Sequence, residues 1–190
     1  MLSFPSFLLA VRQGAVAALP TDTVPALAAI PQSRDRIYLL KRRDPNKPLI
    51  LMGATAAELA DYVDFGRFPP SLWKTVVTSC WPGAITLVLP ANGPGQGCNP
   101  GQDTLGLRIP NHPIALAVLQ QTGPLLTTSA NRSGEPPLRS WREIQGAFPE
   151  VVIGTVPDPG SGQPSTVVAW QGDRWETLRP GAHPFPGYES

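Results

Sequence analysis

Residues 123–134 read G-P-L-L-T-T-S-A-N-R-S-G, and this stretch sets the expected fold class. Gly123 stands where a helix over residues 113–121 needs its C-cap, and the apolar residues after it are typical of a buried strand, Leu125 to Thr128. Ser, Thr and Asn side chains follow, so the strand would end in a loop that offers hydroxyl and amide groups. The stretch predicts a helix, a strand and a polar loop that either binds a ligand or forms an ordinary hydrogen-bonded turn.

The same alternation of helices and strands continues along the chain. Helices are expected at 4–12, 33–41, 55–62, 70–77, 113–121 and after Ser140, and strands at 15–19, 84–89, 105–109, 125–128, 151–155, 166–170 and 174–178. A hairpin joins the last two strands, helices separate several others, and residues 92–101 are expected to form a glycine-rich loop. This combination predicts an α/β or α+β protein with one mixed, twisted β-sheet flanked by helices.

Length and composition favour a single domain over residues 1–190. Hydrophobic residues make up 42% and charged residues 15%, which suits a packed protein and argues against disorder. The net charge of +1 indicates no nucleic-acid partner by itself, although basic residues could still cluster on one face. No signal peptide or long apolar span is visible, so we expect a cytoplasmic protein without membrane contact.

The common signatures of nucleotide and metal sites are missing from the sequence. It contains neither the G-x-x-x-x-G-K-[ST] loop nor a G-x-G-x-x-G segment after a strand. Cys80 and Cys98 lack the spacing of a metal site, and His112 and His183 each stand beside a proline with no catalytic partner nearby. We therefore expect both histidines to be structural or surface residues, and no side chain is predicted as a metal ligand.

Seven short segments carry more information in their order and spacing than any of them carries alone. They are Leu19 to Val24 (LPTDTV), Lys41 to Arg43 with Lys47 to Leu49, Trp81 to Leu89 (WPGAITLVL), Thr104 to Pro113 (TLGLRIPNHP), Thr127 to Gly134, Ser165 to Val168 (STVV) and Leu178 to Gly181 (LRPG). Together they resemble the YrdC/TsaC family, the threonylcarbamoyl-adenylate synthases of tRNA modification. The resemblance covers about residues 14–181 and is to the short, single-domain form, with residues 183–190 expected as a loose C-terminal tail.

The family resemblance implies a YrdC-like sheet with a concave, positively lined cavity. There L-threonine, bicarbonate and ATP, which enters with Mg²⁺, would become threonylcarbamoyl-AMP and pyrophosphate, so the protein would be a nucleotidyltransferase. A downstream threonylcarbamoyl transferase complex would use the product to form t6A37 in tRNA. Because charge accumulates on phosphate oxygens, positioning and electrostatic stabilisation would carry most of the catalysis.

The resemblance also assigns roles to individual residues. The expected catalytic residues are Lys41 and Arg43, which match a K-x-R pair that meets ATP phosphates, and Ser129 and Asn131, which match an S-x-N motif. ATP contacts are expected from Lys41, Arg43, Lys47, Thr104, Asn131, Ser140 and Arg179, and threonine contacts from Thr21, Thr23, Arg108, Ser129 and Ser165. The residues alone leave alternatives open: a solvated basic helix end for Lys41 and Arg43, and an ion pair at a strand end for Arg108.

The chain departs from the family pattern after its P-T-D-T-V segment. Relatives usually continue with Tyr-Gly-Leu, whereas this chain reads Pro25-Ala26-Leu27. Proline fixes φ and alanine disfavours positive φ, so the backbone of this loop could differ. Two alternative functions therefore stay open. One is a divergent paralogue that binds a nucleotide without making the product, and the other is a protein whose concave basic face binds tRNA or double-stranded RNA.

Overall fold

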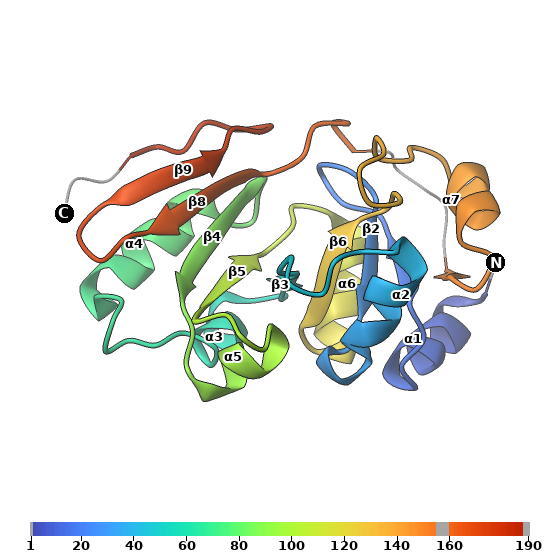
Figure 1. The fold of residues 1–190 in the computed structure, drawn as a ribbon, viewed down its shortest axis with the longest axis horizontal. Helices are drawn as coiled ribbons and strands as arrows, with labels where there is room; N and C mark the ends of the chain where they lie inside the picture. The colour runs from blue at the N-terminus through green and yellow to red at the C-terminus, as the bar shows by residue number, and fades with distance from the viewer. Residues whose placement is uncertain (1, 155–159, 188–190) are drawn as a thin grey trace.

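The structure is a computed structural model that describes residues 2–154 and 160–187. Its strands are β1 (Ala17–Leu19), β2 (Ala26–Ala29), β3 (Ile50–Met52), β4 (Ile85–Pro90), β5 (Thr104–Arg108), β6 (Leu125–Ser129), β7 (Val152–Ile153), β8 (Thr166–Trp170) and β9 (Trp175–Arg179). They form a nine-stranded sheet in the order β7-β1-β2-β6-β3-β5-β4-β8-β9 (Figure 1). Because β1 with β7, β3 with β5 and β4 with β8 are parallel and the other neighbours antiparallel, the predicted mixed sheet is confirmed.

Helices pack on both faces of this sheet. They are α1 (Phe4–Arg12), α2 (Arg34–Lys41), α3 (Ala56–Ala60), α4 (Pro70–Cys80), α5 (Gly93–Cys98), α6 (Pro113–Thr122) and α7 (Trp141–Ala147), with a 3-10 turn, η1, at Pro31–Ser33. Figure 1 shows α1 and α7 near the N-terminus at one end of the molecule and the β8–β9 hairpin near the C-terminus at the other. None of the described helices has the length and apolar character needed to span a membrane.

The core is divided by the sheet into two clusters. In β2, Leu27 and Ala29 belong to the larger cluster and Ala28 to the smaller one, as expected where successive side chains point to opposite faces. The larger cluster contains residues of α2 to α5 and α7, and the smaller one joins α1 and α6 to β1, β2 and β6. Helices α1 and α6 therefore cover the sheet face of the smaller cluster over β1, β2 and β6. The other end of this same face, over β5, β4 and β8, holds a cavity.

The structure differs from the sequence-based expectation at short elements. β2 and β3 have only four and three residues, too few for a periodic pattern to reveal them. The predicted loop at 92–101 is wrong, because α5 lies within it. The Asn92 side chain caps this helix by accepting from the Gly95 N–H at 3.1 Å. The strand expected at 151–155 is observed as β7, and Thr155 lies outside the described residues.

Residues 182–185, at the start of the expected C-terminal tail, contact the rest of the protein. The Ala182 N–H donates to the Pro164 carbonyl oxygen at 2.8 Å, and the Thr166 hydroxyl donates to the carbonyl oxygen of His183. The ring of Phe185 packs on Trp175 with their centroids 5.2 Å apart. Aromatic packing and hydrogen bonds therefore hold residues 182–185 near the β8–β9 hairpin.

Pro25-Ala26, the departure from the family pattern, leads into β2. Ala26 pairs with Leu19 of β1 and with Ser129 of β6, and the Pro25 carbonyl oxygen accepts from the Ala130 N–H at 2.8 Å. Proline suits this place because it precedes the strand. Among the described residues, Arg42 is the one residue other than glycine with a positive φ. Ala26 therefore does not have a positive φ, and its backbone conformation does not require glycine.

Arg42 ends α2 in the left-handed conformation, with φ 51° and ψ 44°. A side chain in this region costs about 1 kcal/mol that glycine does not incur. We expect Arg42→Gly to raise the free energy of unfolding by about 1 kcal/mol and the Tm by about 3 °C. Thermal and urea denaturation measure both quantities. Arg36→Gly makes the same substitution inside α2 and should instead lower the free energy of unfolding by about 1 kcal/mol. Equal losses of stability in the two variants would contradict the expectation.

Candidate active site

A cavity of about 480 Å³ opens on the sheet face that α1 and α6 leave uncovered. Seven of the residues expected at the site line it: Thr23, Arg43, Thr104, Arg108, Ser129, Ser165 and Arg179. These residues come from segments up to 156 positions apart in the sequence, as the positions of Thr23 and Arg179 show. The cavity lies within the usual size range of small-molecule sites.

Strand alternation explains why small and polar groups line the cavity floor. Thr104, Gly106 and Arg108 of β5 face it, whereas Leu105 and Leu107 between them are buried in the core. A Cβ atom at Gly106 would lie 3.3 Å from Thr86 Cγ2 and 3.4 Å from Ile50 Cγ1. Glycine at this position therefore deepens the floor between the neighbouring strands.

Arg108 is buried at the end of β5 and is held by three acceptors. Its Nε donates to the Gly83 carbonyl oxygen at 2.9 Å, Nη1 to Thr23 Oγ1 at 2.8 Å, and Nη2 to Asp22 Oδ1 at 2.7 Å. Burial lowers the pKa of Arg108, while the Asp22 carboxylate acts in the opposite direction. The strand-end ion pair expected as the alternative is thus present, and Arg108 also lines the cavity.

Thr21 stands behind this pair rather than in the cavity wall. It is fully buried, its hydroxyl donates to the Val24 carbonyl oxygen at 2.7 Å, and its Oγ1 lies 3.0 Å from Thr23 Oγ1. Its side chain also accepts from the Thr23 N–H at 3.1 Å. These bonds fix the loop that carries Asp22 and Thr23, so Thr21 positions its neighbours.

Lys41 is buried behind the wall formed by the end of β6. Its ammonium donates to the carbonyl oxygen of Ser129, to the Asn131 carbonyl oxygen at 2.6 Å and to Asn131 Oδ1 at 3.1 Å. Asn131 Oδ1 also accepts from Ser129 Oγ at 2.5 Å, and Asn131 Nδ2 donates to the Glu135 carbonyl oxygen. Neither Lys41 nor Asn131 is among the cavity-lining residues, so both hold the loop that presents Ser129.

Burial lowers the pKa of Lys41 to about 7, and Arg43 adds a smaller repulsion in the same direction. The unfolded chain keeps this lysine protonated up to about pH 10.4, so the unfolded state binds more protons above pH 7 and stability rises with pH. We expect this lysine to contribute an increase of about 0.7 kcal/mol between about pH 6.5 and 7.5. Urea unfolding of the wild type and of Lys41→Met at several pH values isolates this contribution. Parallel pH profiles of the unfolding free energy in the two proteins would contradict the lowered pKa of Lys41.

Arg43 and Arg179 place two more guanidinium groups at the cavity. Arg43 Nη2 donates to the Pro48 carbonyl oxygen at 3.0 Å, and Arg179 Nη2 donates to the Ser165 carbonyl oxygen at 2.7 Å. Burial lowers the pKa of both arginines. Neither forms an ion pair with a carboxylate among the described residues, which leaves their charge available to an anion.

Lys47 and Ser140, like Lys41 and Asn131, are predicted ATP contacts that lie away from the cavity lining. Lys47 is exposed, and its carbonyl oxygen accepts from the Tyr38 hydroxyl at 3.0 Å. Ser140 caps α7: its Oγ accepts from the Glu143 N–H at 3.2 Å, and its own N–H donates to the Glu143 carboxylate at 2.9 Å. The geometry thus gives both residues structural contacts, and contact with ATP stays a prediction for them.

Other residues at the cavity were missed by the sequence analysis. They include Thr86, Gln102 and Gly106, whereas Thr127 and Thr128 belong to the polar stretch that the sequence had already placed at the site. Thr86 Oγ1 lies 2.9 Å from Ser165 Oγ, so it orients a predicted site residue. The alternation of apolar and small polar residues along 84–89 and 104–108 was the available signal.

The remaining candidates from the sequence have structural places. His112 caps α6, where its ring nitrogen accepts from the Ala115 N–H at 3.4 Å, in agreement with the structural role expected for it. Cys80 and Cys98 are buried thiols whose pKa values burial raises to about 12 and about 11. Among the described residues no group of three or more His, Cys, Asp or Glu side chains could hold a metal ion.

The model of the Sua5/YciO/YrdC family, described as telomere recombination, matches residues 9–181. The chain belongs to this family.

Curated relatives in the Sua5/YciO/YrdC family carry the name threonylcarbamoyl-AMP synthase. The Klebsiella pneumoniae protein is 36% identical over 138 residues, which cover 70% of this chain and 72% of the relative. The Pseudoalteromonas translucida protein is 36% identical over 83% of this chain and 87% of its own length. The Bacillus subtilis protein is 35% identical over 90% of this chain, which spans about half, 51%, of that relative.

Solved structures support the same family fold. The structure of P. abyssi Sua5 complexed with L-threonine matches with a TM-score of 0.80 and 30% identity, over 92% of this chain and 52% of that chain. Escherichia coli YciO matches with a TM-score of 0.82 over 94% of this chain and 89% of that chain. At 24% identity the YciO match shows the fold alone.

Proposed function

We propose that this protein is a threonylcarbamoyl-AMP synthase that uses L-threonine, bicarbonate and ATP and releases pyrophosphate. The observation that carries the proposal is the cavity, where Thr23, Arg43, Arg108, Ser129 and Arg179 come together from distant segments. The synthase name of relatives 36% identical over most of the chain supports the same reaction. We further propose that residues 1–190 act as one domain, in the cytoplasm, where ATP and tRNA are found.

In the proposed reaction, the threonine amine forms a C–N bond with the carbon of bicarbonate, and water leaves. The carbamate oxygen then attacks the α-phosphorus of ATP, and the bond to the β-phosphate oxygen breaks to release pyrophosphate. Negative charge moves onto the leaving phosphates in this step. Arg43 and Arg179, which line the cavity without a described carboxylate partner, would offset that charge.

The polar groups around Arg108 suit the threonine substrate. Arg108 holds Thr23 in place at 2.8 Å, and Ser129 lies on the strand next to Ala26. We assign the threonine carboxylate and hydroxyl to this polar cluster, and Thr104, Ser165 and Thr86 to nucleotide or threonine hydroxyls. Mg²⁺ would enter as part of the ATP substrate, since no carboxylate is among the described side chains that line the cavity.

Pyrophosphate release tests the proposal directly. Purified protein with ATP and bicarbonate should release pyrophosphate only when L-threonine is added, and omission of bicarbonate should slow release. Turnover without threonine, or nucleotide binding without turnover, would favour the divergent paralogue and exclude the synthase.

The synthase name of the curated relatives favours the synthase over an RNA-binding protein as the function of this chain. The product is proposed to pass to a threonylcarbamoyl transferase complex. Transfer of threonylcarbamoyl to tRNA in a coupled assay measures that step separately.

A further inference from the structure

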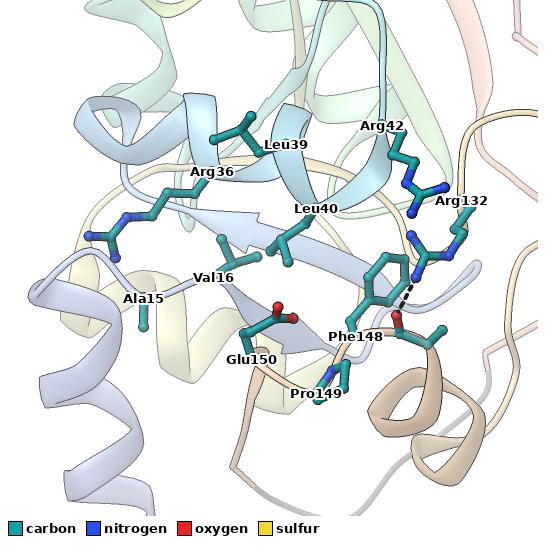
Figure 2. Close-up of a pocket in the computed structure, with 11 residues that line it drawn as sticks. Ala15, Val16, Arg36, Leu39, Leu40, Arg42, Arg132, Phe148, Pro149 and Glu150 are labelled. Carbon is teal, nitrogen blue, oxygen red and sulfur yellow. Dashed lines mark hydrogen bonds between the residues drawn. The ribbon is translucent and has the colours of Figure 1, made fainter.

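A second cavity, of about 550 Å³, shares none of its described lining residues with the candidate active site. Its walls are the outer side of α2, the chain just before β1, the loop after β6 and the segment after α7. Figure 2 shows the guanidinium groups of Arg42 and Arg132 at one end of this cavity and Arg36 at the other. The proposed synthase reaction gives none of these residues a task.

The end that holds Arg42 and Arg132 is suited to an anion with two charges. Arg132 Nη2 donates to the Ala147 carbonyl oxygen at 3.0 Å, and its guanidinium carbon lies 5.5 Å from the centroid of the Phe148 ring. These contacts hold one guanidinium in a fixed orientation. Neither arginine forms an ion pair with a carboxylate among the described residues, and two guanidinium forks match a phosphate group better than a singly charged carboxylate.

The middle of the cavity limits what can be attached to that phosphate. Val16 and Leu40 present apolar side chains there, and Glu150 contributes the one carboxylate among the described lining residues. A second anionic group would meet the Glu150 charge, so a polyphosphate or dicarboxylate fits poorly. Arg36 donates to the Gly14 carbonyl oxygen at 2.7 Å, which anchors the far end.

The backbone at Arg42 provides an independent observation. This residue keeps a long charged side chain at a position with φ 51°, where glycine is the least strained residue. Its neighbours in sequence point elsewhere: Lys41 is buried against the loop after β6, and Arg43 lines the first cavity. The conformation thus turns Arg42 alone of the three basic residues toward the second cavity.

We propose that this second cavity binds a small phosphate monoester with an uncharged, apolar tail. The phosphate lies between Arg42 and Arg132, and the tail rests on Val16 and Leu40. This site is separate from the synthase reaction and does not depend on it.

Titration of the ¹⁵N-labelled protein with phenyl phosphate tests the site by NMR. We expect shifts of the backbone amides of residues 42, 132 and 148, and binding at least fivefold tighter than that of inorganic phosphate because the ring adds apolar contact. Arg42→Gly, which relieves backbone strain and so should fold, and Arg132→Gln should each weaken binding at least tenfold. Arg142→Gln removes the same charge from α7 outside the lining and should bind as the wild type does.

The same titration can overturn the site in three ways. Shifts confined to residues 43 and 104 would place the phosphate in the first cavity. Equal affinity for inorganic phosphate would remove the apolar tail from the proposal. Unchanged affinity in Arg42→Gly and Arg132→Gln would remove the arginine pair, and each of these results contradicts the inference.

Discussion

Asp22→Asn should lower the free energy of unfolding by about 3 kcal/mol, because it leaves the buried guanidinium of Arg108 without its counter-charge. The side chain of Arg108 is 3% exposed and that of Asp22 15% exposed, with 2.7 Å between Arg108 Nη2 and Asp22 Oδ1. Asparagine keeps the volume and one acceptor oxygen, so the loss reports on charge rather than on packing. For a chain of this length the Tm should fall by roughly 6 to 12 °C.

The matched control is Asp103→Asn, which breaks an ion pair of similar length at the surface. Arg67 Nη2 lies 2.9 Å from Asp103 Oδ2, but their side chains are 47% and 69% exposed. Water screens that pair, and its loss should change stability by less than about 1 kcal/mol. Urea unfolding of both variants separates the cases, and equal effects would show that the Asp22 charge is not needed to compensate Arg108.

Arg43→Ala should reduce threonine-dependent pyrophosphate release by tenfold to a hundredfold, since one charge-assisted contact with a phosphate is worth about 1.5 to 3 kcal/mol. Arg43 lines the cavity, and its described hydrogen bonds are to the carbonyl oxygens of Lys47 and Pro48, which leave the positive charge uncompensated. The loss should appear mainly in kcat if Arg43 stabilises the charge that develops on the leaving phosphates.

Arg34→Ala is the control for this variant. Arg34 begins α2, pairs with Asp35 at 3.2 Å and is absent from the cavity lining, so steady-state turnover should stay within twofold of the wild type. Circular dichroism and Tm values should establish that both variants are folded. Wild-type turnover in Arg43→Ala would remove this residue from the proposed chemistry.

Local signals in the sequence predicted several elements correctly for physical reasons that act over a few residues. The capping boxes at Thr55 with Glu58 and at Ser140 with Glu143 mark α3 and α7, because side chain and backbone exchange hydrogen bonds within one turn. Gly123 ends α6 with φ 76°, a backbone that favours glycine. β3, by contrast, is three residues long and is defined by pairing with β5 and β6.

The candidate site also combines features that the sequence predicted with features that depend on tertiary contacts. The order of the motifs predicted the family, and the family is confirmed. The sequence alone could not distinguish the positions of Lys41 and Arg43. In the structure Lys41 is buried against carbonyl oxygens, and Arg43 lines the cavity. The left-handed backbone at Arg42, where α2 ends, decides which of these basic side chains faces which cavity.

The sequence by itself determined the family, the mixed sheet and the set of polar residues at the strand ends. The stretch over residues 123–134 already contained a helix end, a strand and a polar loop, because capping and alternation are local effects. Only the tertiary structure decided which polar groups reach the cavity and which support it: Ser129 lines it, while Asn131 binds Lys41 behind it. That division depends on burial and on partners as far away as the 90 positions that separate Lys41 from Asn131.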